Sequence, residues 1–378
     1  MGWIALRMLT GDKVKYYGLI FGIAFSTLLI AQQSTLFVNL MLRASAAIWG
    51  VTDANIWVMD RSTKFVDGTR PLPETDLYRV RGVPGVAWAV PHMRQGASVR
   101  TPAGELEQVT VVGLDDASLI GLPKKILRGS LADLSAPNAL LIDDVGSRKL
   151  FPGKDPIGQE IELNDQRGVV RGVVDVNPSF TSGVLLYTKY SNALNYVPGT
   201  RNRMTFVFAR SADNESPETV ARRIEQATGL RARTQQEFAL DSIRYVAGNT
   251  GIPINFGLTV ILGFIVGVAI VGLTFSLFIR DNIKQFGALK AIGVTNSKIR
   301  GMVSLQAAWI GFIGYSIGIA LAVMFIFIGG NNSDTFKAFY TPWQVLVGVG
   351  AAVLLMVFGT GYVALRKVLK TEPAEVFR

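Results

Sequence analysis

The chain has 378 residues, of which 49% are hydrophobic and 17% are charged, and it contains 39 Gly and no Cys. This apolar composition excludes a disordered chain and argues against a wholly soluble one. The lack of Cys excludes a disulfide scaffold, a thiolate metal site and a cysteine nucleophile. A net charge of +10 would suit nucleic acid, so the positions of the charges decide what it means.

Four charge-free stretches are long enough to cross a bilayer, whose apolar core requires about 20 helical residues. Lipid offers no hydrogen-bond partners to a backbone, so these spans must be helices. We expect them near Gly18–Leu40, Asn255–Ile279, Gln306–Ile328 and Pro342–Leu365.

The first span has an alternative interpretation as a signal peptide. Basic residues precede it, and Ala44-Ser45-Ala46 resembles a small-residue cleavage site. Its apolar run, however, is nearly twice the usual signal-peptide length of about 7–15 residues. We therefore expect a retained helix.

Basic residues gather in the N-terminal segment, the loop 280–300 and the C-terminal tail, which together hold twelve Lys or Arg and four Asp or Glu. The segment 43–253 carries 25 basic and 23 acidic residues, so most of the net positive charge belongs to the three basic segments. Lys and Arg collect in cytoplasmic segments. We therefore expect both termini and the loop 280–300 in the cytoplasm, and 43–253 outside. The charge is a topology signal and argues against nucleic-acid binding.

Between the first two spans, the pattern predicts a mixed α+β domain of about 210 residues, which is large enough for a core of its own. Two hairpins are expected, pairing 98–100 with 109–114 and 161–163 with 169–176. Ser216 and Pro217 start a helix that Gly229 ends. The other expected elements are strands at Ala139–Ile142, Met204–Ala209 and Arg231–Thr234, a helix at Asp144–Phe151, and a stalk at Gln235–Gly251.

Few residues could carry catalysis. His92 is the single histidine; a Ser-His-Asp site is formally possible, but we interpret His92 as structural. The pairs Asp115-Asp116 and Asp143-Asp144 are adjacent, so their side chains diverge, whereas catalytic carboxylates converge from different elements. We interpret them as turn or cap residues. The segment Pro152–Asp155 lacks the Ser or Thr of a phosphate loop. We expect no catalytic residue, metal site or cofactor in this chain.

The spans carry no central charge, which argues against an ion-coupled transporter. They carry instead small residues four positions apart, which allow close helix approach. The alternative is that Gly is simply frequent in membrane helices. The candidate packing residues are Gly18, Gly22, Gly263, Gly267, Gly314 and Gly318.

The loop 280–300 holds a short amphipathic helix in which Ile283, Phe286 and Leu289 share a face with Lys290. Gly293 can end this helix in the left-handed conformation, and Asn296 or Ser297 can cap the next one. Two interpretations stay open: a helix on the membrane surface with basic residues toward lipid headgroups, or a docking helix for a cytoplasmic partner.

The segment Lys284-Gln-Phe-Gly-Ala-Leu-Lys-Ala-Ile-Gly293 resembles the coupling segment of MacB/FtsX-type ABC permeases. Further stretches resemble the family's N-terminal opening (Ala5–Arg7), extracytoplasmic core (Leu150–Gly158, Val169–Val174), third span (Ile299, Gln306–Gly318) and tail (Thr371–Phe377). Gln285 and Gln306 stand where many members have Glu. Together with Tyr315, these residues make the chain resemble the DevC branch more closely than MacB itself; in that branch the ATPase is a separate chain. A neutral Gln285 lacks the salt bridge that a carboxylate could make to the ATPase.

The resemblance implies a multi-pass subunit of the bacterial inner membrane, with four helices and a large α+β domain inserted between helices 1 and 2. We expect helix 1 in 1–42, the extracytoplasmic domain with its stalk in 43–253, and helices 2–4 with the coupling loop and tail in 254–378. The chain would work as a homodimer with a cytoplasmic ABC ATPase that binds the ATP. A membrane-fusion adaptor and an outer-membrane channel are possible further partners, beside membrane lipid.

The resemblance also implies a role. ATP hydrolysis would move the outside domain and so drive export or extraction of a lipophilic or peptide substrate. The residues expected to contact the ATPase are Lys284, Gln285, Phe286, Gly287, Leu289, Lys290 and Gly293. The alternative is an FtsX-like regulator that activates an extracytoplasmic cell-wall hydrolase. The size of the outside domain favours transport.

Overall fold

The computed structural model describes residues 2–101, 104–180, 183–197 and 204–370, with side chains up to residue 366. The chain divides into two compact units. The helical unit contains Met1–Asn39 and Gly251–Arg378, and the α/β unit contains Leu40–Thr250. One boundary lies inside a helix, and the other lies between two helices, at Thr250–Gly251.

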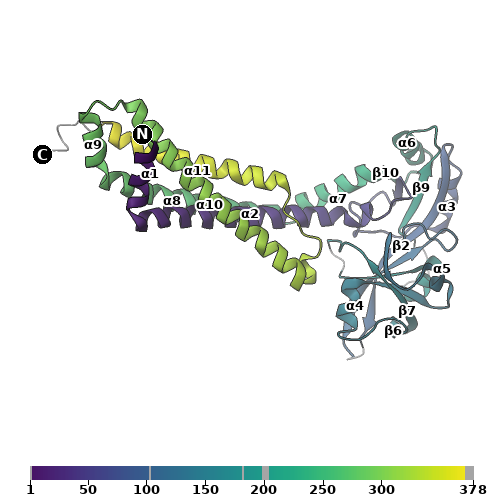
Figure 1. The fold of residues 1–378 in the computed structure, drawn as a ribbon. Coiled ribbons are helices and arrows are strands. Elements are labelled where there is room, and N and C mark those ends of the chain that lie inside the picture. The colour runs from purple at the N-terminus through teal and green to yellow at the C-terminus, as the bar shows by residue number, and fades with distance from the viewer. Residues whose placement is uncertain (1, 102–103, 181–182, 198–203, 371–378) are drawn as a thin grey trace. The chain divides into compact units, whose positions relative to one another are not determined.

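Within the described residues, four helices are long and apolar enough to cross a membrane, and all four expected spans are found. Each helix is longer than the span expected for it. The longest have 37 residues, or about 55 Å at 1.5 Å per residue, which exceeds the apolar thickness of a bilayer. Figure 1 shows them as α2 (Lys13–Trp49), α8 (Ile252–Asp281), α10 (Asn296–Asn332) and α11 (Trp343–Lys370).

Three shorter elements complete the helical unit. Helix α1 (Gly2–Gly11) lies before α2, helix α9 (Ile283–Ala291) connects α8 to α10, and a 3₁₀ turn (Asp334–Phe336) lies between α10 and α11. The core of the unit joins apolar side chains from all the helices, including Leu9, Ile23, Phe275 and Met356. Large apolar side chains are also exposed on its outside, as expected of helices that meet lipid rather than water.

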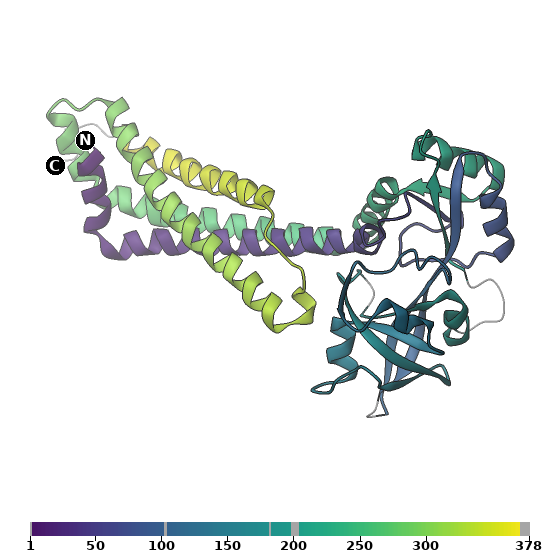
Figure 2. The same ribbon diagram turned by 45° about the vertical axis from the view of Figure 1, so that its right-hand side comes forward.

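The α/β unit is built on a ten-stranded sheet in the described residues, ordered β10-β1-β9-β2-β3-β8-β5-β7-β4, with β6 paired to β2 and β7. Strand β2 belongs to two groups of strands: Val86–His92 pairs with β9, and Met93–Arg100 pairs with β3. Figure 2 shows these groups as two lobes. The strands are β1 (Ile56–Met59), β2 (Val86–Arg100), β3 (Leu106–Leu114), β4 (Lys125–Arg128), β5 (Ala139–Asp143), β6 (Glu160–Leu163), β7 (Gln166–Asp175), β8 (Val184–Lys189), β9 (Phe206–Ser211) and β10 (Arg231–Thr234).

Helices α3 (Glu74–Arg81), α4 (Asp144–Leu150), α5 (Tyr190–Tyr196) and α6 (Pro217–Thr228) accompany the strands. Both expected hairpins form, as β2–β3 and β6–β7. Helix α6 has the expected ends: the Ser216 hydroxyl accepts from the Thr219 N–H, and Gly229 has a φ of 72°. Strands β1, β4 and β8 and helices α3 and α5 were not expected from the sequence. Strand β1 is buried at all four positions, so it lacks the alternation that marks a half-exposed strand.

The last turns of α2 are held within the α/β unit beside helix α7 (Gln235–Asn249). The Gln235 side-chain amide donates to the carbonyls of Ile48 (2.9 Å) and Val51 (2.5 Å). Ile48 also joins a core cluster with Trp57, Phe208 and Phe238, the last of these from α7. Both helices are thereby anchored on the same part of the sheet.

Candidate functional site

Helix α9 is held between α8 and α10 by defined ends. At its start, the buried Asn282 side chain donates to the Phe278 carbonyl at 2.8 Å. At its end, Gly293 has a φ of 92°; its N–H donates to Lys290, and that of Val294 donates to Leu289, both at 3.0 Å. These are the two hydrogen bonds of a Schellman motif, and Gly293 ends α9 as expected. Thr295 precedes α10 without a side-chain cap, so the expected cap at Asn296 or Ser297 is not found.

The two faces of α9 differ. Phe286 is fully buried in the core of the helical unit, Gly287 is buried with it, and Leu289 packs against that core. The exposed side chains are Lys284, Gln285, Ala288, Ala291 and Ile292, which share the opposite face at helical spacing. Lys290 is half-buried.

This arrangement differs from the expected contact set. The Phe286 side chain points inward, so it is not available for direct contact with a partner. The physical reason is that α9 rests on an apolar bundle core, which takes the one large aromatic side chain of the helix. Hydrophobic periodicity shows that a helix has an apolar face, but it cannot show which partner that face meets.

The outward face of α9 is suited to close contact. Ala288 and Ala291 are small, so another surface can approach the helix backbone there. Ile292, whose side chain is 77% exposed, adds an apolar contact at one end. Lys284 and Gln285 add polar groups at the other. The face is a narrow, mostly apolar strip with a positive edge.

Helix α1 packs on α10 through a buried polar contact. The fully buried Gln306 donates from Nε2 to the Ala5 carbonyl at 2.7 Å, while its Oε1 has no hydrogen-bond partner in the described residues. Ala5 and Leu9 form the buried face of α1. An ionised Glu at position 306 could not donate to Ala5, so the neutral amide suits this buried position.

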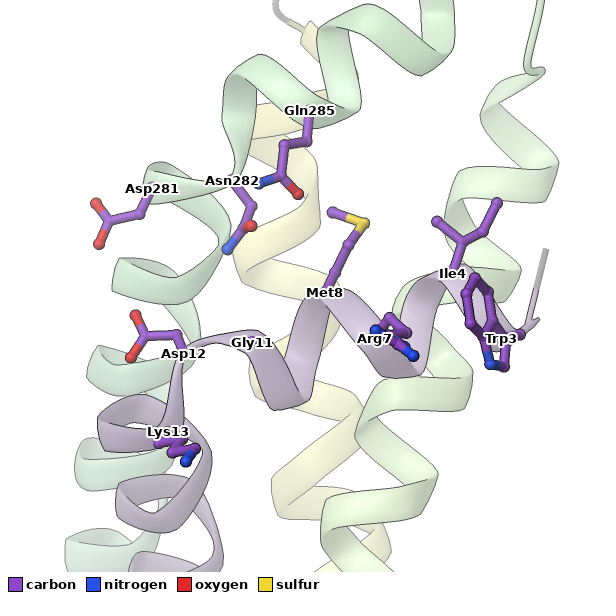
Figure 3. A pocket seen from close by; sticks show the side chains of 10 residues that line it. All are labelled: Trp3, Ile4, Arg7, Met8, Gly11, Asp12, Lys13, Asp281, Asn282 and Gln285. Atoms are coloured by element: carbon purple, nitrogen blue, oxygen red, sulfur yellow. The ribbon is translucent and has the colours of Figure 1, made fainter.

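A cleft of about 910 Å³ lies where α1 faces the junction of α8 and α9 (Figure 3). Met8 points across it toward Asn282 and Gln285. At one end, Lys15 forms ion pairs with Asp12 and with Asp281, the latter at 2.5 Å. The residues that line the cleft are Trp3, Ile4, Arg7, Met8, Gly11, Asp12, Lys13, Asp281, Asn282 and Gln285. No motif in the sequence marked this cleft.

The six candidate packing glycines face neighbouring helices to different degrees. A Cβ on Gly22 would lie 2.6 Å from Ile270, one on Gly267 would lie 2.3 Å from Ser26, and one on Gly314 would lie 2.6 Å from Ile23. At Gly318 it would meet both Thr27 (2.5 Å) and the Ala24 carbonyl oxygen (2.6 Å). Gly263 and Gly18 are looser, with nearest atoms at 3.4 Å and 3.8 Å.

The candidate titratable groups of the α/β unit have structural surroundings. His92 is buried against Phe208, with ring centroids 4.1 Å apart. Burial lowers its pKa to about 3, with a further contribution from Arg94. Asp143 caps α4 by accepting from the Gly146 N–H, Asp115 accepts from the Ser118 N–H, and Asp116 accepts from the Ser191 N–H. Across the described ranges, no group of three or more His, Cys, Asp or Glu could hold a metal.

Two family models match this chain. The MacB-like periplasmic core domain matches residues 17–227, and the FtsX-like permease C-terminal domain matches residues 257–373. The chain is 24% identical over 320 residues to the macrolide export ATP-binding/permease protein MacB of Agrobacterium fabrum, covering 81% of this chain and 49% of that protein. It is 24% identical over 250 residues to a probable export ATP-binding/permease protein of Pseudomonas fluorescens, covering 62% and 37%. The chain thus spans about half or less of the length of these relatives.

Two solved structures are similar to parts of the chain. The periplasmic region of MacB from Actinobacillus actinomycetemcomitans is 16% identical, with a TM-score of 0.37, covering 54% of this chain and 96% of that one. The extracellular domain of the transporter YknZ from Gram-positive bacteria is 19% identical, with a TM-score of 0.36, covering 48% and 98%. TM-scores this low carry no argument by themselves. The family models do, because the core-domain model alone matches more than half of the chain: this protein belongs to the MacB/FtsX-type family of ABC transporter permeases, which are membrane proteins.

Proposed function

We propose that this permease couples ATP hydrolysis by a separate ABC ATPase to movement of an extracytoplasmic α/β unit, and so drives export or extraction of a lipophilic or peptide substrate. The observation that carries the proposal is the two-sided character of α9. Its outward face offers Ala288 and Ala291 for close contact, while its inward face fixes Phe286 in the core of the helical unit. A force applied to the outer face would therefore reach the bundle.

The charge asymmetry supports the orientation. Basic residues gather around α1, α9 and the C-terminal tail, which favours the cytoplasm for these segments. Both termini would then lie there, and the α/β unit would lie outside. Helix α2 runs without interruption from Lys13 to Trp49, so it would pass motion from the bundle to the sheet. Helices α7 and α8 are separate elements, interrupted at Thr250–Gly251, so α2 is the stiffer connection.

The partners follow from this proposal. The chain would act as a homodimer with a cytoplasmic ATPase that binds the ATP, and the chain itself would hold no cofactor. A membrane-fusion adaptor and an outer-membrane channel would extend the path outward. The contact set on α9 is the exposed one, with Lys284 and Gln285 as the polar edge. Lys290 is half-buried on the inward side of the helix, and Gly293 sets the end of the helix. The DevC-like organisation stays a prediction.

Pull-down of the ABC ATPase by the purified chain tests the docking face. Ala288→Glu places a bulky charge in the middle of the outward face without touching the core, and burying an unpaired charge costs several kcal/mol. We expect it to abolish pull-down. Ser297→Glu adds the same charge at an exposed position of the same segment, off the α9 face, and should preserve it.

Lys284→Ala should weaken the complex only slightly, because one exposed ion pair contributes about 0–1 kcal/mol, and the deficit should shrink with salt. Unimpaired pull-down by Ala288→Glu would refute docking through this face and favour a helix lying on lipid. Stimulation of the ATPase by lipid or peptide fractions would support transport, whereas capture of a cell-wall hydrolase by the α/β unit would support the regulatory alternative.

A further inference from the structure

The cleft between α1 and the α8–α9 junction lies at the end of two membrane-crossing helices. Lys13 begins α2 and Asp281 ends α8, and both residues line the cleft. These positions are where the apolar stretches give way to charged residues. We therefore expect the cleft at the level where lipid headgroups meet the protein.

The charges at the cleft are divided into a paired and an unpaired set. Lys15 bridges Asp12 and Asp281, so one cation offsets one of the two carboxylate charges, and with Arg7 and Lys13 the cleft keeps a net positive charge. Arg7 and Lys13 form no ion pair with any acidic side chain in the part of the chain that the structure describes. Arg7 instead lies over the Trp3 ring, 4.8 Å from its centroid. Two cations are left for an anion from outside the chain.

The other side chains at the cleft are apolar or carry amides. Trp3 is 68% exposed and Ile4 is 38% exposed, while the opposite face of α1, with Ala5 and Leu9, is buried. An exposed Trp beside basic residues at a membrane boundary is typical of a helix that contacts the lipid interface. Across the cleft, Figure 3 shows Gln285 directed toward α1, where its amide can donate to an oxygen.

We propose that this cleft binds the phosphate-bearing headgroup of an anionic phospholipid. Arg7 would pair with the phosphate, the Gln285 amide would donate to one of its oxygens, and Ile4 and Met8 would contact the glycerol and the first acyl carbons. Lys13, which lies at the other end of the cleft beside Asp12, would add positive charge near the headgroup. Basic pockets between membrane helices are suited to such headgroups. A free phosphate would leave the apolar side chains and most of the cleft without a contact, which favours the lipid.

A lipid bound there touches both α1 and Gln285 of α9. Its occupancy would therefore affect the position of the helix that we propose docks the ATPase. The binding claim itself rests only on membrane insertion, so its failure and the failure of the docking proposal are separable.

Native mass spectrometry of the full-length chain in a neutral detergent tests the proposal, with phosphatidylglycerol and phosphatidylcholine as the two probes. The wild type should retain phosphatidylglycerol in preference to phosphatidylcholine. Arg7→Gln with Lys13→Gln should weaken that retention by about 30-fold, since each basic residue near an anionic headgroup contributes about 1 kcal/mol. The matched control, Lys298→Gln with Arg300→Gln, removes two exposed charges outside the cleft and should leave retention unchanged.

Four results would overturn the proposal. The cleft variant could retain phosphatidylglycerol as well as the wild type, or the control could lose as much, which would indicate general surface charge. Displacement of the lipid by excess inorganic phosphate would indicate a free-anion site. Loss of ATPase pull-down with full lipid retention in the cleft variant would indicate a protein-docking surface.

Discussion

The two units of this chain bury their cores by opposite means. In the α/β unit, large aromatic side chains such as Trp57 and Phe206 lie inside, and charged side chains such as Lys125 and Asp175 pair on the surface. In the helical unit, glycines such as Gly318 bring helices together, while large side chains such as Phe327 are exposed. The first pattern is that of a domain in water, and the second is that of a bundle in lipid, where close packing replaces the hydrophobic effect between helices.

This difference decides what a substitution does in each unit. In the α/β unit, a substitution that introduces a charge should destabilise the fold at a buried position and have little effect at an exposed one. In the membrane-spanning part of the helical unit, both sides of a helix are apolar, so bulk at a contact matters as much as polarity. Helix α9 is intermediate, because its inner face packs on the bundle and its outer face is exposed and bears Lys284 and Gln285 beside small apolar residues.

The largest expected effect comes from the inner face of α9. Phe286→Asp places a charge in a fully buried position; removing a buried Phe side chain costs about 3–5 kcal/mol, and burying the charge adds to that. Gln285→Asp, on the exposed side of the same turn, adds the same charge and should cost less than about 0.5 kcal/mol. Thermal unfolding of the helical unit in detergent measures both. Equal stability of the two variants would show that Phe286 is not in the core.

A smaller effect is expected at the helix contacts. A Cβ on Gly318 would overlap the Ala24 carbonyl oxygen, so Gly318→Ala should destabilise the bundle by about 1–3 kcal/mol. A Cβ on Gly359, in α11, has no atom within 4 Å, so Gly359→Ala should be neutral or stabilise by up to about 1 kcal/mol. Unfolding of the two variants in detergent gives the comparison. Equal effects would contradict packing through Gly318.

An effect of similar size is expected in the α/β unit, whose stability should depend on pH through His92. The pKa of His92 is lowered to about 3 in the folded unit, against about 6.5 when unfolded. The unfolded state therefore binds a proton below pH 6.5 that the folded state refuses, so stability is full above pH 6.5 and falls as the pH drops toward 3. At pH 5 the loss is about 2 kcal/mol.

Hydrogen exchange of the β9 amides in the full-length chain measures this loss, because exchange reports the free energy of opening. The chain has one His, so His92→Phe, which keeps a ring against Phe208, is the matched control and should remove the pH dependence between 7 and 5 that the wild type shows. An identical dependence in both chains would mean that His92 is not responsible.

Much of the fold is predictable from local patterns in the sequence. Absence of charge over whole stretches predicts the four spans, and the Ser216–Pro217 start and Gly229 end predict α6. The short buried strands β1 and β8 are not predictable in this way, because an apolar run of four to six residues lacks a period that separates strand from helix. The division of β2 between two groups of partner strands is also not predictable from local sequence, because the pairing depends on strands that are distant in the chain.

The candidate site is predictable in place but not in orientation. The motif at 284–293 locates α9, and Gly293 predicts its end. Which face of α9 is buried depends on how α1, α8 and α10 pack around it. The motif alone therefore does not show that the Phe286 side chain lies in the core. The cleft depends on α1 folding back toward α9, which needs Gln306 and Ala5 to meet across 301 residues of sequence. Contacts that distant leave no local signal.

The central claim is that α9 and the α/β unit lie on opposite sides of one membrane. Cysteine labelling tests it directly, because the chain has no Cys of its own. Lys154 is exposed in the α/β unit, and Lys298 is exposed just after α9. The two variants are Lys154→Cys and Lys298→Cys. With an impermeant maleimide applied to spheroplasts, the account predicts labelling at 154 before lysis and at 298 only after it. Labelling of both positions before lysis, or of 154 only after lysis, would contradict it.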